Sequence, residues 1–212
     1  MSETIEQGAR AYHHGALREA LLNAAREIVR TEGVQAFTLR EAARRAGVSH
    51  GAPAHHFGDK TGLLTELAVQ VLEERLALIA DYGARAGAEP IAQLKACGLA
   101  NIDFMIANPR LDELCWRSDA IDRTHPALQA AQGKLAGDLI TRMSAATGQA
   151  LNPDKESNPS TLLAIAIVHG FAQLVNERMI LTHVPEDERA ARAHQLADEM
   201  LDFMQDLFRG LR

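Results

Sequence analysis

Apolar residues recur along most of this chain at the three- and four-residue spacing of amphipathic α-helices. The first apolar stripe predicts a helix from about Ala16 to Arg30, and a longer one predicts a helix from about Lys60 to Tyr82. Residues 1–12 carry no such stripe, so we expect them to form a loose N-terminal arm. No segment alternates as a strand would. The pattern therefore predicts an all-α fold.

Proline and small cap residues mark the starts of the remaining helices. We expect helices from about Ile91 to Ala107, from Pro109, from Pro126 to about Thr147, from Pro159 to about Thr182, and after Pro185. Acidic residues follow Pro185 and arginines end the chain, which suits the dipole of a last helix. Residues 148–158 are loop-like. With the short helices described below, the chain is predicted to form about nine helices.

The composition agrees with a folded helical protein, because 47% of the residues are hydrophobic, 24% are charged and only 4% are aromatic. No apolar run reaches the roughly 18 residues of a membrane span, and the N-terminus lacks a signal-peptide core. We therefore expect a cytoplasmic protein with no membrane partner. Cys97 and Cys115 show no metal-type spacing, so we expect two reduced thiols.

The charge is distributed unevenly along the chain. The formal net charge is −6, which by itself argues against a nucleic-acid binder. Residues 1–60, however, hold eight Lys and Arg against seven Asp and Glu, a balance of +1, and they carry five of the nine histidines. The remainder holds 14 against 21, a balance of −7. A neutral-to-basic head on an acidic body is predicted.

The segment from Thr38 to Phe57 has the pattern of a helix-turn-helix. Thr38 and Glu41 match a capping box, which satisfies two orphan amides reciprocally at a helix start. Ala43 and Gly47 supply the small residue and the glycine turn that two crossing short helices require. Ser49 is the expected N-cap of the second short helix. A three-helix head is therefore predicted near the N-terminus.

The polar positions of this motif are predicted to meet DNA. The second short helix could enter a major groove about 12 Å wide. Its outward polar residues are Ser49, His50, His55 and His56. Lys60 could bind phosphate, and the helix N-terminus beside it could add backbone amides. The other candidates are Arg40 and Arg44 on the first short helix and Arg10, Tyr12, His13 and His14 in the arm.

The run GVSHGAPAHHFGDKTGLL (Gly47 to Leu64), preceded by FTLREAARRA, resembles the TetR family of bacterial repressors. The likeness covers about residues 15–65. It implies an all-α dimer with a flexible arm (1–14), a helix-turn-helix head (15–60) and a ligand-binding and dimerisation body (61–212). The segment from Ala166 to Ala172 also resembles a C-terminal subclass with a Trp…His-Gly motif, although Ile165 takes the tryptophan place.

The resemblance implies roles for particular residues. Arg40 and His50 match base-reading positions, and Ala52 matches a contact to a thymine methyl. Ser49, His55, His56 and Lys60 match phosphate or groove contacts. The chain departs from the family at Ala54, where a tyrosine usually touches a phosphate. Without that tyrosine, one contact to the DNA backbone would have to come from His55 or Tyr12.

The two C-terminal helices are predicted to form a dimer interface. The last helix has apolar residues at steps of four and three, a seam suited to helix packing. The preceding helix is apolar nearly all round and must be covered on two sides. The interface residues we expect are Leu162, Phe171, Leu174, Ala193, Ala197, Met200, Met204 and Leu207. The alternative is that both helices complete the core of one chain.

Residues of the middle helices are candidates for an effector pocket. A cleft between helices would suit an apolar or aromatic small molecule, and Trp116 offers both a flat face and a donor. The candidates are Phe104, Met105, Cys115, Trp116, Arg117, Leu139, Met143 and His169. The alternative for each is ordinary core packing, and His169 could be a satisfied core histidine.

These features predict a ligand-responsive, sequence-specific repressor that binds operator DNA as a homodimer. An activator, and a helical adaptor whose degenerate motif no longer reads DNA, are the alternatives that remain. No catalytic triad, carboxylate pair or phosphate loop stands out, so we expect no enzyme and no cofactor. The adjacent pairs His13-His14 and His55-His56 point apart on a helix, so we expect no metal site.

Overall fold

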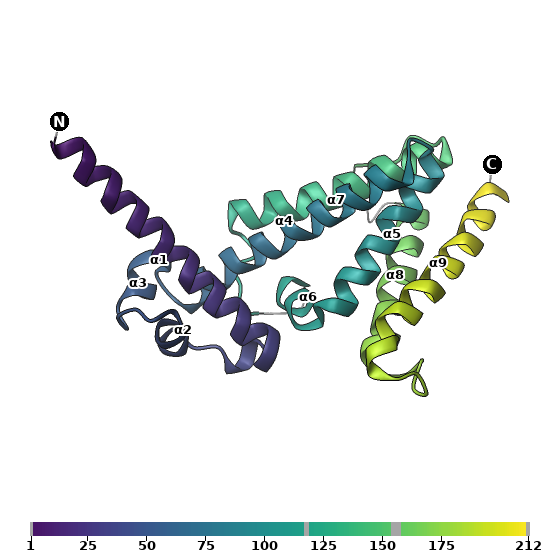
Figure 1. Cartoon of the computed structure of the whole chain (residues 1–212). Helices are drawn as coiled ribbons and strands as arrows, with labels where there is room; N and C mark the ends of the chain where they lie inside the picture. Colours follow the sequence, from purple (N-terminus) through teal and green to yellow (C-terminus); the bar gives the residue numbers. More distant parts are fainter. Residues whose placement is uncertain (1, 117–118, 154–157, 211–212) are drawn as a thin grey trace. The chain divides into compact units, whose positions relative to one another are not determined.

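The computed structural model describes the backbone of residues 2–116, 119–153 and 158–210, and the side chains of residues 15–116, 119–153 and 158–204. Every regular element within these ranges is a helix, which confirms the all-α prediction (Figure 1). The α-helices are α1 (Ser2–Glu32), α2 (Leu39–Ala46), α3 (Ala52–Phe57), α4 (Lys60–Ala86), α5 (Pro90–Ala107), α6 (Pro109–Trp116), α7 (Pro126–Thr147), α8 (Pro159–Asn176) and α9 (Glu186–Gly210). A 3-10 turn, η1 (Val34–Ala36), follows α1.

Four helices begin at a proline, and the sequence predicted three of these starts at that residue. The four helices are α5, α6, α7 and α8. Proline suits a first helical position because its missing N–H would have no intrahelical partner there.

Helix α4 begins after an acidic cap instead. Asp59 precedes α4, and its Oδ1 accepts a hydrogen bond from the Gly62 amide at 2.8 Å. The sequence therefore predicted these helix starts closely.

Two helix boundaries differ from the prediction. The first helix begins at Ser2 instead of about Ala16, so residues 2–12 are helical and do not form a loose arm. Residues such as Glu, Gln, Ala and Arg favour a helix even where no apolar face is present. Helix α8 ends at Asn176 instead of about Thr182, because Arg178 and Leu181 adopt positive φ angles of 56° and 55°.

The chain divides into two compact units that do not follow the predicted limits at residues 60 and 61. The first unit comprises residues 1–71 and 110–129, and the second comprises residues 72–109 and 130–212. Helix α4 passes from one unit into the other. Helix α6 and the segment after it thus group with the helix-turn-helix.

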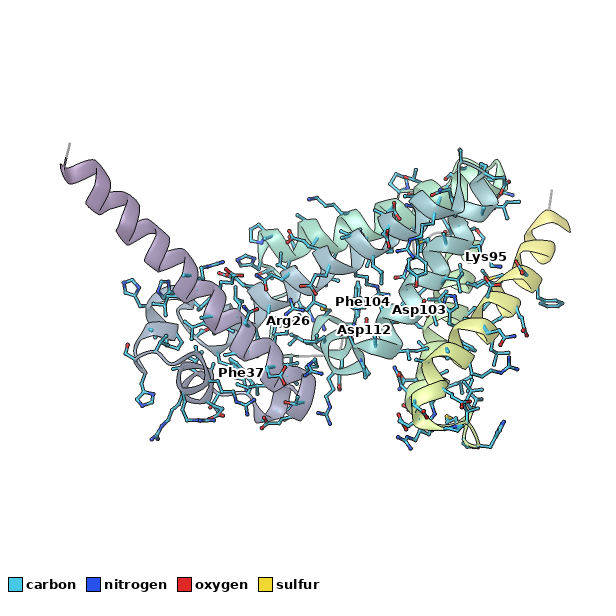
Figure 2. The ribbon with its side chains drawn as sticks, viewed as in Figure 1. Arg26, Phe37, Lys95, Asp103, Phe104 and Asp112 are labelled. Atoms are coloured by element: carbon cyan, nitrogen blue, oxygen red, sulfur yellow. The ribbon has the colours of Figure 1, made fainter. Side chains whose placement is uncertain are left out.

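Helices α1, α2 and α3 share the core of the first unit. Helix α1 packs against α2, η1 and α3. Ile28, Phe37 and Ala43 are completely buried, and Figure 2 shows Phe37 beside these helices. Leu63 and Leu64 of α4 are also completely buried. The apolar stripe of α1 that the sequence predicted therefore anchors the two short helices.

In the second unit, α5 packs against both α8 and α9. Arg75 of α4 is also buried there, with an exposed fraction of 2%. Its Nε donates to Asn101 Oδ1 at 2.7 Å, and its guanidinium lies 5.6 Å from the Phe104 ring centroid. The interior of this unit therefore includes a cation held by a hydrogen bond and an aromatic ring.

Both cysteines are free and buried. Burial raises the pKa of the Cys97 thiol to about 11. A thiol with a raised pKa forms little thiolate, which is the reactive species. This environment agrees with the predicted reduced thiols.

The apolar character of helix α8 bears on the prediction that the chain has no membrane-spanning segment. Among the described residues, one helix is both long enough and apolar enough to cross a membrane. It is Pro159–Asn176, with a mean hydropathy of 1.3. A helix that joins a protein core passes the same test. Ala164, Val168 and Phe171 of α8 lie in the core of the second unit, so one face of this helix is already covered by protein.

Candidate DNA-binding site

The turn after α2 has the geometry of a helix-turn-helix. Thr38 Oγ1 accepts the Glu41 amide at 3.2 Å, which confirms one half of the predicted capping box. The reciprocal half is absent, because the Glu41 carboxylate pairs with arginines instead. Gly47 ends α2 in the left-handed region, with φ 68° and ψ 29°, and its amide bonds back into the last turn. A residue without a Cβ adopts this conformation readily.

Helix α3 is shorter than predicted. It begins at Ala52 with Gly51 as N-cap, and so the expectation that Ser49 caps it is wrong. Pro53 lies in the first turn and is buried together with Phe57. Proline is favourable in that turn and fixes where the helix starts. Ser49 and His50 consequently lie in the turn between α2 and α3.

The polar side chains predicted to meet DNA gather around this motif. Arg40, Arg44, Ser49, His50 and His55 are exposed. Ala52, His56 and Lys60 are half-buried, and the rings of His55 and His56 meet edge to face at 5.3 Å. The side chains of Arg10, Tyr12, His13 and His14 lie outside the described residues. The described part of the chain holds no cluster of three metal-ligating side chains.

Lys60 and the start of α4 differ in part from the predicted phosphate site. The Lys60 ammonium lies 5.9 Å from the Phe37 ring centroid. The Gly62 amide, one of the donors expected to meet a phosphate, is already bound to the Asp59 carboxylate. A phosphate at this helix start would therefore be held first by the lysine charge.

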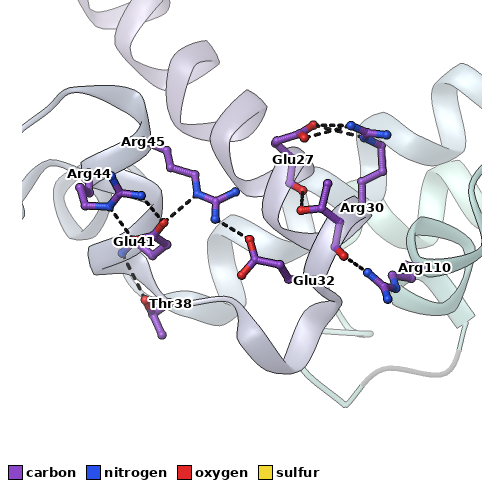
Figure 3. A network of polar contacts seen from close by, with 9 residues as sticks. Glu27, Arg30, Glu32, Thr38, Glu41, Arg44, Arg45 and Arg110 are labelled. Carbon is purple, nitrogen blue, oxygen red and sulfur yellow. Dashed lines mark hydrogen bonds and ion pairs between the residues drawn. The ribbon is translucent and has the colours of Figure 1, made fainter.

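A network of ion pairs surrounds α2 (Figure 3). Glu41 binds Arg44 through two hydrogen bonds of 2.8 and 2.6 Å, and it accepts a third from Arg45 at 2.7 Å. Arg45 also pairs with Glu32 at the end of α1. The hydrogen bonds from Arg44 and then from Arg45 lower the pKa of Glu41 to about 2. The spacings of three and four residues from Glu41 to Arg44 and Arg45 were the available sequence signal for these two pairs, which were not predicted.

The predicted pocket residues do not form one group. Cys115 and Trp116 belong to the first unit, whereas Phe104, Met105, Leu139, Met143 and His169 belong to the second. Met105 and Met143 are packed in the core of that unit. His169 is exposed on α8, with Nδ1 3.1 Å from the Ile165 carbonyl, so it is not a core histidine. Arg117 lies outside the described residues.

The second unit has a groove of about 500 Å³ between α4, α5 and α9. None of the predicted pocket residues lines it. Its wall includes Tyr82, Lys95 and Leu99. Lys95 binds Asp198 at 2.7 Å and Asp202 at 2.6 Å, so the polar side of the groove is already paired within the chain.

The predicted dimer residues separate into two groups. The core of the chain itself buries Phe171, Ala193, Ala197 and Met204. These residues are therefore not available to a partner, although we predicted them in the dimer interface. Their apolar spacing is satisfied by α5, which packs against both α8 and α9. Leu162 and Leu174 are 43% and 37% exposed, and Met200 is half-buried. The side chain of Leu207 lies outside the described residues.

Two short helices joined by a glycine turn, held by α1 and bearing an exposed polar face, define a helix-turn-helix DNA-binding protein. The family described as "Bacterial regulatory proteins, tetR family" matches residues 21–67. The HTH-type transcriptional regulator BetI of Burkholderia thailandensis is 30% identical over 189 residues, which cover 88% of this chain and 92% of that protein. The chain belongs to the tetR family and is a DNA-binding transcriptional regulator.

Two further comparisons show how far the similarity extends along the chain. BetI of Stenotrophomonas maltophilia is 40% identical over 86 residues, which cover 41% of this chain and 44% of that protein. A solved structure from Rhodococcus sp. RHA1, described as a protein with unknown function, is 29% identical with a TM-score of 0.66. That likeness covers 89% of this chain and 96% of the solved one. The similarity therefore extends well beyond the helix-turn-helix.

Proposed function

We propose that this chain is a dimeric repressor that reads an operator through α3 and is released by a small molecule. The observation that carries the proposal is the exposed polar face of α2, α3 and the turn between them, which includes Arg40, Ser49 and His50. Regulators of this family bind operator DNA and act as dimers with small-molecule effectors. The proposal places the protein in the cytoplasm and gives it no catalytic step.

The exposed side chains suit different parts of a DNA duplex. Arg40 and His50 are proposed to read base edges, since their donors can reach into a groove. Ser49, His55, His56 and Lys60 are proposed to hold phosphates, which positions the head without reading sequence. The methyl of Ala52 is proposed to contact a thymine methyl. Tyr12, which lies on α1, is proposed to contact the DNA backbone.

The exposed face of α8 supports the proposed dimer. This helix is apolar, and part of its surface is exposed. The exposed residues are Leu162, Leu163, Ala166, Gly170 and Leu174. Among the described residues, and apart from the backbone of α8 itself, nothing lies within 4 Å of the place where a Cβ on Gly170 would stand. A second copy could therefore approach closely along α8 and cover this face. Two heads in one dimer would read half-sites about 34–36 Å apart, or a multiple of that distance.

The proposed effector acts by binding one state of the dimer better than the other. A ligand shifts a two-state equilibrium only by its difference in affinity for the two states. Within the second unit, Phe104, Met105, Leu139 and Met143 remain the proposed recognition residues for an apolar molecule. Since Met105 and Met143 are packed in the core, such a ligand would have to displace side chains to enter between them.

The proposed base and phosphate contacts can be separated by two substitutions. His50→Ala is expected to weaken binding to the preferred operator about tenfold and to change the preferred base at one position of each half-site. Lys60→Ala is expected to weaken binding to every sequence alike and to lower the salt slope by about one. Binding titrations across operator variants and salt concentrations measure both effects. Identical behaviour of the two variants would contradict these roles.

A further inference from the structure

Glu41 occupies a central place among the charges of α2. Its Oε2 accepts Arg44 Nε at 2.8 Å, and its Oε1 accepts the terminal nitrogen of Arg44 at 2.6 Å. The same Oε1 also accepts Arg45 Nε at 2.7 Å. One carboxylate thus holds two guanidinium groups on the helix before the recognition helix.

The two arginines have different surroundings. Arg45 is 27% exposed and also pairs with Glu32, so it ties α2 to the end of α1. The Arg44 side chain is 66% exposed and lies beside the proposed DNA-binding face. A guanidinium has five N–H donors, and Glu41 engages only one edge of Arg44. The remaining donors of Arg44 can still bind a phosphate while Glu41 holds the group in place.

The Glu41 carboxylate also weakens the attraction of the head to DNA. It places a negative charge beside the cation that is expected to approach the DNA backbone. The Arg44 and Arg45 hydrogen bonds lower the pKa of Glu41 to about 2, so the carboxylate is charged at neutral pH. A charge of this sign weakens attraction to any phosphate, whatever the base sequence.

We infer that Glu41 is a positioning residue that sets the specificity of the head: it orients Arg44 for one operator phosphate and reduces binding to non-operator DNA. The inference rests on the proposed DNA-binding face. On the operator, one phosphate is aligned with the Arg44 guanidinium that Glu41 holds in place. The bond between Arg44 and this phosphate offsets the repulsion from Glu41. On other sequences the alignment fails, and the repulsion from Glu41 remains.

The chain contains a matched control for this inference. Glu27 and Arg30 on α1 form the same kind of pair, three residues apart, with hydrogen bonds of 3.2, 2.9 and 3.0 Å. Their side chains are 50% and 53% exposed. Glu27→Gln therefore removes the same charge from a similar ion pair that is not on the helix-turn-helix.

The experiment compares the wild-type dimer with Glu41→Gln, Glu41→Asp and Glu27→Gln. The probes are an operator duplex selected by the wild type from a random pool and a scrambled duplex of equal length. Glu41→Gln is expected to bind the scrambled duplex about fivefold tighter, the effect of one charge about 8 Å from the backbone in each of two heads. Its operator affinity is expected to stay unchanged or fall. The ratio of the two affinities therefore drops at least about fivefold.

The other variants distinguish positioning from a general charge effect. Glu41→Asp keeps the charge and is expected to keep the weak binding to the scrambled duplex. Glu27→Gln is expected to change both affinities by the same factor, leaving their ratio unchanged. If Glu41→Gln also leaves the ratio unchanged, the inference is overturned although the proposed function stands. A wild-type protein that does not discriminate between the duplexes would instead overturn the proposed function.

A second variant keeps the inference testable if Glu41→Gln melts below the assay temperature. Arg44→Gln leaves Glu41 paired with Arg45 and removes only the positioned cation. It is expected to lower operator affinity about tenfold, the size of a lost charge-assisted contact, without strengthening binding to the scrambled duplex. An equal loss on both duplexes would contradict the positioning role of Glu41.

Discussion

Replacing Gly170 by glutamate is expected to convert the dimer to monomers and to weaken operator binding at least about a hundredfold, because uncompensated charges buried at an interface cost about 3–5 kcal/mol. Gly170 is exposed on α8, and outside its own helix backbone no atom of the described residues lies within 4 Å of the position of its missing Cβ. The substitution therefore introduces no clash inside one chain. It also raises helix propensity by roughly 0.5–1 kcal/mol.

Gly133→Glu is the matched control for this prediction. Gly133 is likewise an exposed glycine within a helix, α7, with nothing near its Cβ position. Light scattering after gel filtration measures the molecular mass, and thermal unfolding checks the fold. The Gly133 variant is expected to remain a dimer with wild-type operator affinity. A Gly170→Glu protein that stays dimeric and binds normally would place the dimer interface elsewhere.

Enlarging Ala43 to leucine is expected to destabilise the head by about 2–3 kcal/mol, because extra methyl groups in a packed core force neighbouring elements apart. Ala43 of α2 is completely buried at the place where α1 packs against α2. Separation of these helices would also displace α3. Operator affinity is therefore expected to fall by at least about tenfold even where the protein stays folded.

Ala16→Leu provides the comparison for Ala43→Leu. Ala16 is exposed on α1, so the same added volume meets no packed neighbour. Chemical denaturation and operator titration measure stability and binding in parallel. Ala16→Leu is expected to match the wild type in both. An Ala43→Leu protein with wild-type stability would show that the helix crossing does not need a small residue there.

The helix-turn-helix was predictable because its geometry depends on local chemistry. Gly47 adopts the left-handed conformation that the turn requires, and Thr38 caps α2 through a contact three residues away. The prolines that open α5 to α8 act within a single turn of helix in the same way. Features that depend on neighbouring residues could therefore be inferred from the sequence with good accuracy.

Features that depend on distant partners were less predictable. The apolar spacing of Ala193, Ala197 and Met204 defines a stripe on α9 without saying which helix covers it. In the structure α5 of the same chain covers the stripe, so these residues belong to the core and not to a dimer surface. The pairing of Arg45 with Glu32 likewise joins residues that are far apart in the sequence.

The polar candidates of the site show the same limit. The sequence identified the exposed His50, His55 and Arg40, because a short helix after a turn has few positions that can face inward. It did not indicate that Glu41 holds Arg44. Residue type and spacing suggest which side chains can meet DNA. Their competing partners become visible only when side chains are placed in space.

Selection of bound duplexes from a random pool, followed by titration of the enriched sequence, tests the central claim most directly. The account predicts an enriched motif with two symmetry-related half-sites. It also predicts two chains per duplex and a preference of about a thousandfold or more over scrambled DNA at physiological salt. No enriched motif, together with equal affinity for selected and scrambled duplexes, would contradict sequence-specific reading by α3.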